Sequence, residues 1–214
     1  MENIINETIK YIKGIFEHDY SGHDFFHSLR VYRTAVEIAK YENANIYLVS
    51  LAALLHDVDD IKLSPKTHNK KDNAVAFMKK MNISQKDIST ICEIIDSVSF
   101  KGFDTIKPSS IEAKCVQDAD RLDALGAIGI ARAFAYGGNH NRPIYDPDIK
   151  PIEEIGKEEY QNNTSTTINH FYEKLFKLKE LMNTEYGTKI AVQREDFMRM
   201  FIKEFMLEWN GDNN

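Results

Sequence analysis

Hydrophobic side chains recur every three or four positions along most of this chain, which is the spacing of one face of an α-helix. Near the N-terminus this stripe runs through Ile5, Ile9, Ile12 and Phe16 and predicts a helix over residues 2–18. The segment 46–59 is apolar on all sides, which favours a helix at the centre of a bundle. No segment alternates between hydrophobic and polar residues for long enough to predict a β-strand. The sequence therefore predicts an all-α, single-domain helical bundle over residues 1–214, with further helices over residues 25–42, 69–82, 84–99, 110–135, 164–182 and 187–209.

Polar and glycine-containing segments interrupt this pattern. Residues 19–24 (DYSGHD) predict a turn, and Asp24 is a candidate N-cap for the helix that follows. Gly126 and Gly129 indicate that the helix over 110–135 is divided into two pieces. Residues 136–163 include the glycine- and proline-containing stretch YGGNHNRPIYDPDIKP and predict a long irregular segment, which in a compact domain is usually functional or mobile.

Composition excludes several classes of protein. Of the 214 residues 43% are hydrophobic and 28% are charged, which is typical of a folded globular protein and not of a disordered one. The net charge of −6 argues against binding to duplex nucleic acid, although a local basic or metal cluster can still bind a small anion. The apolar runs are far shorter than the ~20 residues of a membrane helix, and the N-terminus lacks the apolar region of a secretory signal. We therefore expect a cytoplasmic protein without membrane contact, whose Cys92 and Cys115 are reduced thiols.

Two histidines and two aspartates stand out because they lie in or beside apolar segments. His56 and Asp57 are adjacent near the end of segment 46–59, His27 lies near the start of the helix 25–42, and Asp120 lies within 110–135. A buried carboxylate must be paired or bind a metal, so His56 and Asp57 form either a structural ion pair or part of a metal site. Two nitrogen and two oxygen ligands suit one six-coordinate divalent ion, Mn²⁺, Fe²⁺, Co²⁺, Ni²⁺ or Mg²⁺, better than four-coordinate zinc.

The order and surroundings of these residues resemble the H…HD…D signature of the HD-domain superfamily of metal-dependent phosphohydrolases. The segments GHDFFHSLRVYRTA (22–35), SLAALLHDVDD (50–60) and QDADRLDALGAIGIARAFAYGG (117–138) are similar to those of its small bacterial and archaeal members that act on nucleotides. The resemblance extends over about residues 20–205. It implies a helical fold of the HD type and one divalent metal ion held by His27, His56, Asp57 and Asp120.

Residues near these four positions are candidates for catalysis and substrate binding. Asp60 resembles the additional acidic residue that follows the HD pair in several branches of the superfamily, and it is a candidate general acid or base. Arg30 lies one helical turn after His27, near the same face, where it can reach a phosphate. The candidate catalytic residues are Asp60, His23 and Arg33, and the candidate substrate-binding residues are Arg30, Lys62, Arg121, Asp123, His140 and Arg142. The alternatives are surface salt bridges for the arginines, a pairing of Asp123 with Arg121, and a solvated loop around His140.

The resemblance favours attack of a metal-activated water on a phosphate ester or anhydride of a nucleotide. Within this branch it points first to a nucleoside triphosphate pyrophosphohydrolase. A 5′-nucleotidase-type phosphomonoesterase is the alternative within the same class, and a non-catalytic nucleotide- or metal-binding regulatory module is the alternative from another class. A di-iron enzyme is disfavoured, because such a site needs more histidine ligands than are evident. The apolar C-terminal segment leaves open a homodimer.

Overall fold

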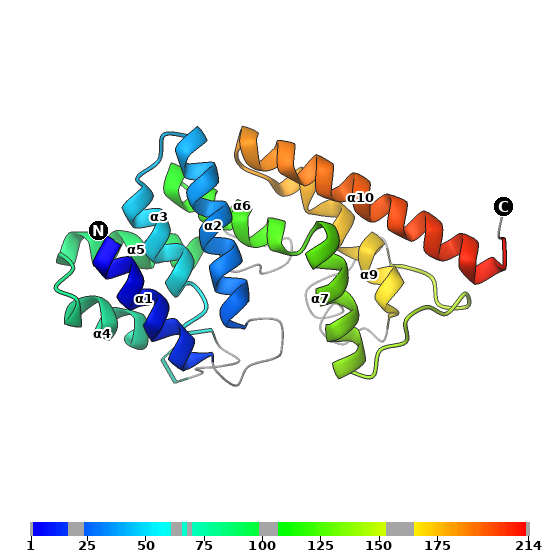
Figure 1. The fold of residues 1–214 in the computed structure, drawn as a ribbon, viewed down its shortest axis with the longest axis horizontal. Coiled ribbons are helices and arrows are strands. Elements are labelled where there is room, and N and C mark those ends of the chain that lie inside the picture. Colours follow the sequence, from blue (N-terminus) through cyan, green and yellow to red (C-terminus); the bar gives the residue numbers. More distant parts are fainter. Residues whose placement is uncertain are drawn as a thin grey trace. The chain divides into compact units, whose positions relative to one another are not determined.

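The computed structural model describes residues 2–16, 24–60, 66–67, 70–98, 107–152 and 165–212. Within these ranges the regular elements are all helical, which confirms the all-α prediction. The chain packs into two compact units, Met1–Asp120 and Arg121–Asn214. Each unit has buried hydrophobic side chains of its own, such as Leu51 in the first and Phe171 in the second, and Figure 1 shows the helices of both. A single domain over residues 1–214 stays a prediction.

The first unit is built around a buried helix. Its elements are α1 (Glu2–Ile15), α2 (Phe25–Tyr41), α3 (Ile46–Leu55), α4 (Asp72–Lys80), α5 (Gln85–Val98) and most of α6 (Ile111–Asp123). Helix α3 contacts α1, α2 and α5 (Figure 1), and every residue from Val49 to Leu55 is buried. The all-round apolar character of this segment therefore places it at the centre of the unit, as the sequence predicts.

Local polar groups set the boundaries of the helices that carry the candidate ligands. The Asp24 carboxylate accepts a hydrogen bond from the backbone N–H of His27 at 2.7 Å, which confirms Asp24 as the N-cap of α2. Asn45 caps α3 in the same way. Helix α3 ends at Leu55, four residues earlier than predicted, because residues 56–59 form turns. In these turns the N–H of Val58 donates to the carbonyl of Leu55, and the N–H of Asp60 donates to that of Asp57.

The second unit contains α7 (Gly126–Asn139), α9 (Thr167–Glu173), the 3₁₀ turns η2 (Leu175–Lys177) and η3 (Lys179–Leu181), and α10 (Glu185–Asn210). Helices α6 and α7 are separate, as predicted, and Gly126 at their junction has a φ of 72°. The helix predicted over 164–182 is instead the short α9 followed by the two 3₁₀ turns. A series of aromatic contacts runs through the core of this unit and reaches Trp209, near the end of α10.

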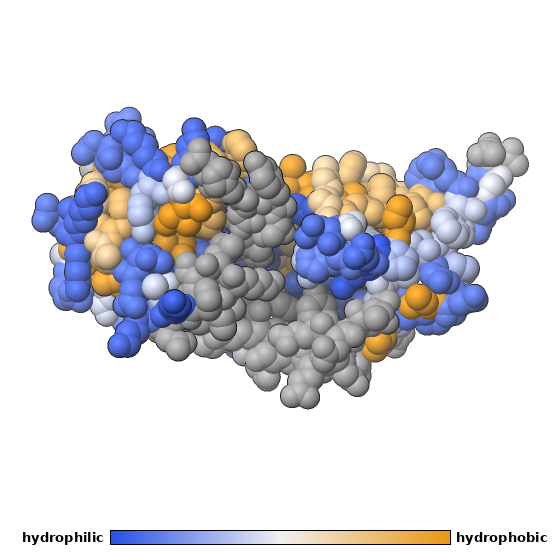
Figure 2. Space-filling model, turned by 90° about the horizontal axis from the view of Figure 1, so that it is seen from below, coloured by the Kyte–Doolittle hydropathy of each residue, from blue (hydrophilic) through white to orange (hydrophobic). Residues whose placement is uncertain are grey.

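Hydrophobic side chains are also present on the surface of the second unit. Figure 2 shows them as orange atoms among polar blue ones on its right-hand part. The exposed residues include Phe197 and Met200 of α10, within the segment where the sequence leaves open a homodimer; that assembly stays a prediction. Among the described residues, no helix has the length and apolar character needed to cross a membrane.

Candidate metal centre

The turn after α3 presents the side chain of His56 in a fixed orientation. Its Nδ1 lies 2.8 Å from the backbone carbonyl oxygen of Ala53. A carbonyl only accepts hydrogen bonds, so Nδ1 carries the proton and donates it. In the neutral form of the ring, the other nitrogen, Nε2, then keeps its lone pair. A histidine whose second nitrogen is oriented by a carbonyl in this way has the arrangement common among metal-binding histidines.

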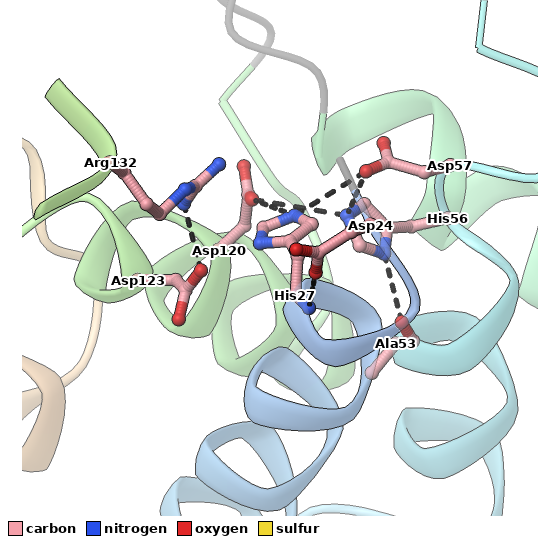
Figure 3. A network of polar contacts seen from close by, with 8 residues as sticks. All are labelled: Asp24, His27, Ala53, His56, Asp57, Asp120, Asp123 and Arg132. Atoms are coloured by element: carbon pink, nitrogen blue, oxygen red, sulfur yellow. Dashed lines mark hydrogen bonds and ion pairs between the residues drawn. The ribbon is translucent and has the colours of Figure 1, made fainter. Parts of the chain in front are cut away.

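Three further side chains point toward this nitrogen (Figure 3). His27 enters from the first turn of α2, Asp57 follows His56 in the turn, and Asp120 enters from α6. Nε2 of His56 lies 3.2 Å from Oδ2 of Asp57 and 3.9 Å from Oδ1 of Asp120. Nε2 of His27 lies 3.4 Å from Oδ2 of Asp57 and also 3.4 Å from Oδ1 of Asp120. The first unit therefore brings together all four residues predicted as ligands.

The chemistry of this cluster fits a divalent metal ion. The ligand atoms of His27, His56 and Asp57 all lie within 4.8 Å of one another. Nε2 of His56 is buried and has no hydrogen-bond partner in the described part of the chain. Burying a nitrogen lone pair opposite two carboxylates costs free energy unless a positive charge lies between the nitrogen and the carboxylates. Imidazole nitrogens and carboxylate oxygens are suitable ligands for that charge.

The pKa values of the clustered side chains also indicate that this site favours a positive charge. Burial alone would lower the pKa of His56, but the nearby carboxylates, Asp57 above all, outweigh it, so the pKa is raised above its ordinary value. Burial alone would raise the pKa of Asp120, but the close approach of His27 and the charge of His56 hold it below its ordinary value. Both directions show that the cluster favours positive charge beside ionised carboxylates.

Comparisons with known proteins match this geometry to a family. The model of the HD domain matches residues 24–125, a range that contains the whole cluster. A crystal structure of an HD-superfamily hydrolase from Bacillus thuringiensis is 40% identical, with a TM-score of 0.79 over 98% of both chains. The chain belongs to the HD superfamily. We refer below to residues 56–59, which carry the histidine and aspartate of the family name, as the HD turn.

Two further relatives are similar to this chain over nearly its whole length. A crystal structure from Lactobacillus plantarum is 42% identical over 99% of both chains, with a TM-score of 0.85. Bacillus subtilis YpgQ is 33% identical over 91% of this chain and 88% of its own length. The crystal structure of YpgQ in complex with ADP has a TM-score of 0.78 to this chain. The resemblance therefore extends beyond the HD cluster to both compact units.

The remaining candidates from the first unit lie on the elements that carry the HD ligands. Arg30 is half-buried on α2, one turn after His27, whereas Arg33 is exposed further along that helix. Asp60 directly follows the HD turn and is partly exposed. His23 and Lys62 lie outside the described residues. The catalytic and substrate-binding roles of these residues stay predictions.

The candidates from the second unit have defined structural partners. Arg121 is buried and donates a hydrogen bond to the carbonyl of Leu181. The buried carboxylate of Asp123 pairs at 2.8 Å with Arg132 of α7 (Figure 3), a partner that the sequence analysis did not name.

His140 and Arg142 lie together at the C-terminal end of α7. The His140 ring stacks on Tyr136 with 3.8 Å between ring centroids, and its Nδ1 lies 2.9 Å from the Tyr136 carbonyl. The Arg142 guanidinium lies 5.8 Å from the centroid of the same ring. The Tyr136 ring thus holds both side chains beside one another, and their contact with substrate stays a prediction.

One residue of the HD turn with a clear structural role was missed by the sequence analysis. Asp59 is buried, and its carboxylate accepts hydrogen bonds from backbone N–H groups at the start of α4. These donors lie 14 and 15 residues further along the chain, so no local capping pattern in the sequence identifies them.

Proposed function

We propose that this HD protein is a metal-dependent phosphohydrolase that converts a nucleoside triphosphate into a monophosphate and pyrophosphate. The observation that carries the proposal is the buried cluster of His27, His56 and Asp57, completed by Asp120, with a histidine nitrogen that lacks a hydrogen-bond partner. The relatives described as HD-superfamily hydrolases support hydrolysis as the reaction class. The YpgQ complex with ADP supports a nucleotide as the substrate class, because this relative accommodates both a nucleobase and a chain of phosphates.

The four clustered side chains would hold the metal ion. A divalent ion in such a site polarises a phosphoryl oxygen and lowers the pKa of a coordinated water. The ion is Mn²⁺, Fe²⁺, Co²⁺, Ni²⁺ or Mg²⁺, since all five accept a mixture of nitrogen and oxygen ligands in six-coordinate geometry. Asp24 contributes by fixing the first turn of α2 and with it the backbone of His27.

The remaining residues would move the proton and bind the phosphates. Water attacks the α-phosphorus, and the bond from that phosphorus to the bridging oxygen breaks, so pyrophosphate leaves with the bond electrons. Asp60, beside the HD turn, is the proposed acceptor of the proton that the attacking water loses. Arg30 and Arg33 are placed on α2 after His27, where guanidinium groups can offset the charge of the phosphate oxygens.

Product analysis tests this function directly. The protein is purified without chelator, its metal content is measured, and release of orthophosphate and pyrophosphate from nucleoside mono-, di- and triphosphates is assayed with each divalent ion. Asp57→Asn removes one charged ligand while it preserves the shape of the side chain. Asp87→Asn is the matched control, because this carboxylate belongs to the same unit but accepts a hydrogen bond from Ser84 at the exposed start of α5.

We expect pyrophosphate release from triphosphates that is lost in Asp57→Asn and kept in Asp87→Asn. Orthophosphate release from monophosphates would instead support the phosphomonoesterase. Bound metal without turnover of any nucleotide would support the regulatory module. Equal activity in both variants would show that the cluster is not the catalytic centre.

A further inference from the structure

Helix α4 lacks a cap from its own sequence. Its first turn begins at Asp72, and the preceding residue, Lys71, occupies the N-cap position in a left-handed conformation with a φ of 52°. The Lys71 side chain makes no capping hydrogen bond and instead pairs with Asp96 at 2.5 Å. The first N–H groups of a helix have no partner within the helix, so they need acceptors from elsewhere.

Asp59 of the HD turn supplies these acceptors. Its Oδ1 accepts the N–H of Asn73 at 3.2 Å, and its Oδ2 accepts the N–H of Ala74 at 2.9 Å. The residue is only 5% exposed, so both hydrogen bonds are shielded from water. A carboxylate at a helix N-terminus also interacts favourably with the positive end of the helix dipole. The HD turn and α4 are therefore joined by two charge-assisted hydrogen bonds.

The partner of Asp59 is itself held in place. The backbone carbonyl of Asn73 accepts a hydrogen bond from the Tyr11 hydroxyl of α1 at 3.2 Å. The side-chain amide of Asn73 donates to the hydroxyl of Thr67 at 3.1 Å. The Tyr11 ring stacks on Phe77 of α4 with 4.2 Å between centroids. The first turn of α4 is thus fixed to α1 and can act as a rigid support.

We propose that Asp59 is a positioning residue that holds the HD turn against α4 and so sets the geometry of His56 and Asp57 for metal binding. Asp59 lies two residues after Asp57, in the same turn, and its hydrogen bonds to Asn73 and Ala74 tie that turn to a different helix. Metal ligands must be held to within about 0.5 Å of the productive geometry. A turn released from α4 would not keep that precision. This inference rests on the proposed function, since it requires a metal ion at these residues.

The test compares metal binding by the full-length protein and two variants of Asp59. Asp59→Ala removes both acceptors, and Asp59→Asn keeps one oxygen acceptor in a side chain of the same shape. Ser84→Ala is the matched control, because Ser84 caps α5 of the same unit through the N–H of Asp87 at 3.1 Å but has no part in the HD turn. Mn²⁺ and Co²⁺ affinities are measured by titration calorimetry, and the visible absorption spectrum of the Co²⁺-loaded protein reports the ligand geometry.

We expect Asp59→Ala to weaken metal binding by about 10- to 100-fold, as loss of residues that orient metal ligands typically does, and to change the Co²⁺ spectrum. Metal binding should be weakened less in Asp59→Asn, and this variant provides the measurement if Asp59→Ala does not fold. Ser84→Ala should melt at a lower temperature but keep the wild-type affinity and spectrum. Wild-type affinity and spectrum in both Asp59 variants would overturn the inference alone. Absence of metal binding in the wild-type protein would overturn the proposed function, and this inference with it.

Discussion

Acidification should destabilise the second unit through His170 of α9. Partial burial, together with the positive charges of Lys174 and Arg142, lowers the pKa of His170 to about 3, against an ordinary value of 6.5. The folded protein therefore keeps this ring neutral under conditions in which the unfolded chain binds a proton. Stability from His170 is fully present above the unfolded pKa and is lost as the pH falls toward the folded one.

The size of this effect follows from the two pKa values. Between about pH 7 and about pH 5 the unfolded chain takes up most of one proton at His170, whereas the folded protein takes up almost none. Each pH unit within the window costs up to about 1.4 kcal/mol of the free energy of unfolding. The loss over the whole interval is then about 2 kcal/mol, as an upper bound because the side chain keeps some exposure to solvent.

Urea denaturation followed by circular dichroism, in the presence of chelator, measures this loss at both pH values. His170→Gln removes the titration, so its free energy of unfolding should decrease less than that of the wild type on acidification, by up to about 2 kcal/mol. His140→Gln is the control, because it makes the same chemical change at an exposed position of the same unit. The same acid-induced loss in His170→Gln and in the wild type would refute the reasoning.

Two further predictions concern the metal centre and the packing of α7. Adding Mn²⁺ or Co²⁺ to chelator-treated protein should raise the melting temperature, because binding at 100 times the Kd stabilises by about 2.7 kcal/mol; a rise of equal size in Asp57→Ala would contradict this. Gly137→Ala should destabilise by about 1–3 kcal/mol, because the new Cβ would lie 2.3 Å from Oγ1 of Thr167. Gly138→Ala meets nothing within 4 Å and should stabilise by up to about 1 kcal/mol in urea denaturation. Equal effects of the two alanines would contradict the packing argument.

The helices that hydrophobic spacing predicts well are those whose ends are also determined locally. Asp24 can be identified as an N-cap from its position before α2, and Gly126 marks a junction that needs a positive φ. The predicted helix over 164–182 fails for a different reason. Phe171, Leu175 and Leu178 are buried and recur every three or four residues, but a repeat of three fits 3₁₀ turns as well as an α-helix.

Some residues of the candidate site could likewise be identified from the sequence and others could not. His27, His56, Asp57 and Asp120 could be found from the sequence because the family resemblance carries their order, and the structure brings them together. The role of Asp59 could not be found, because the N–H groups that its carboxylate binds lie 14 and 15 residues further along the chain. The pairing of Asp123 with Arg132 joins two residues nine positions apart on either side of Gly126, and hydrophobic spacing does not determine how the chain turns between them.

Trp209, near the end of α10, is an intrinsic fluorophore of this protein. It is the only tryptophan of the chain and is about half exposed, at 51%. Its ring stacks on Phe205 and forms a T-shaped pair with Tyr145, with 5.0 Å between the ring centroids. Selective excitation of the indole therefore reports on the last turns of α10 without any added dye. The HD cluster belongs to the first compact unit and Trp209 to the second, so indole emission follows unfolding of the unit that does not carry the metal ligands.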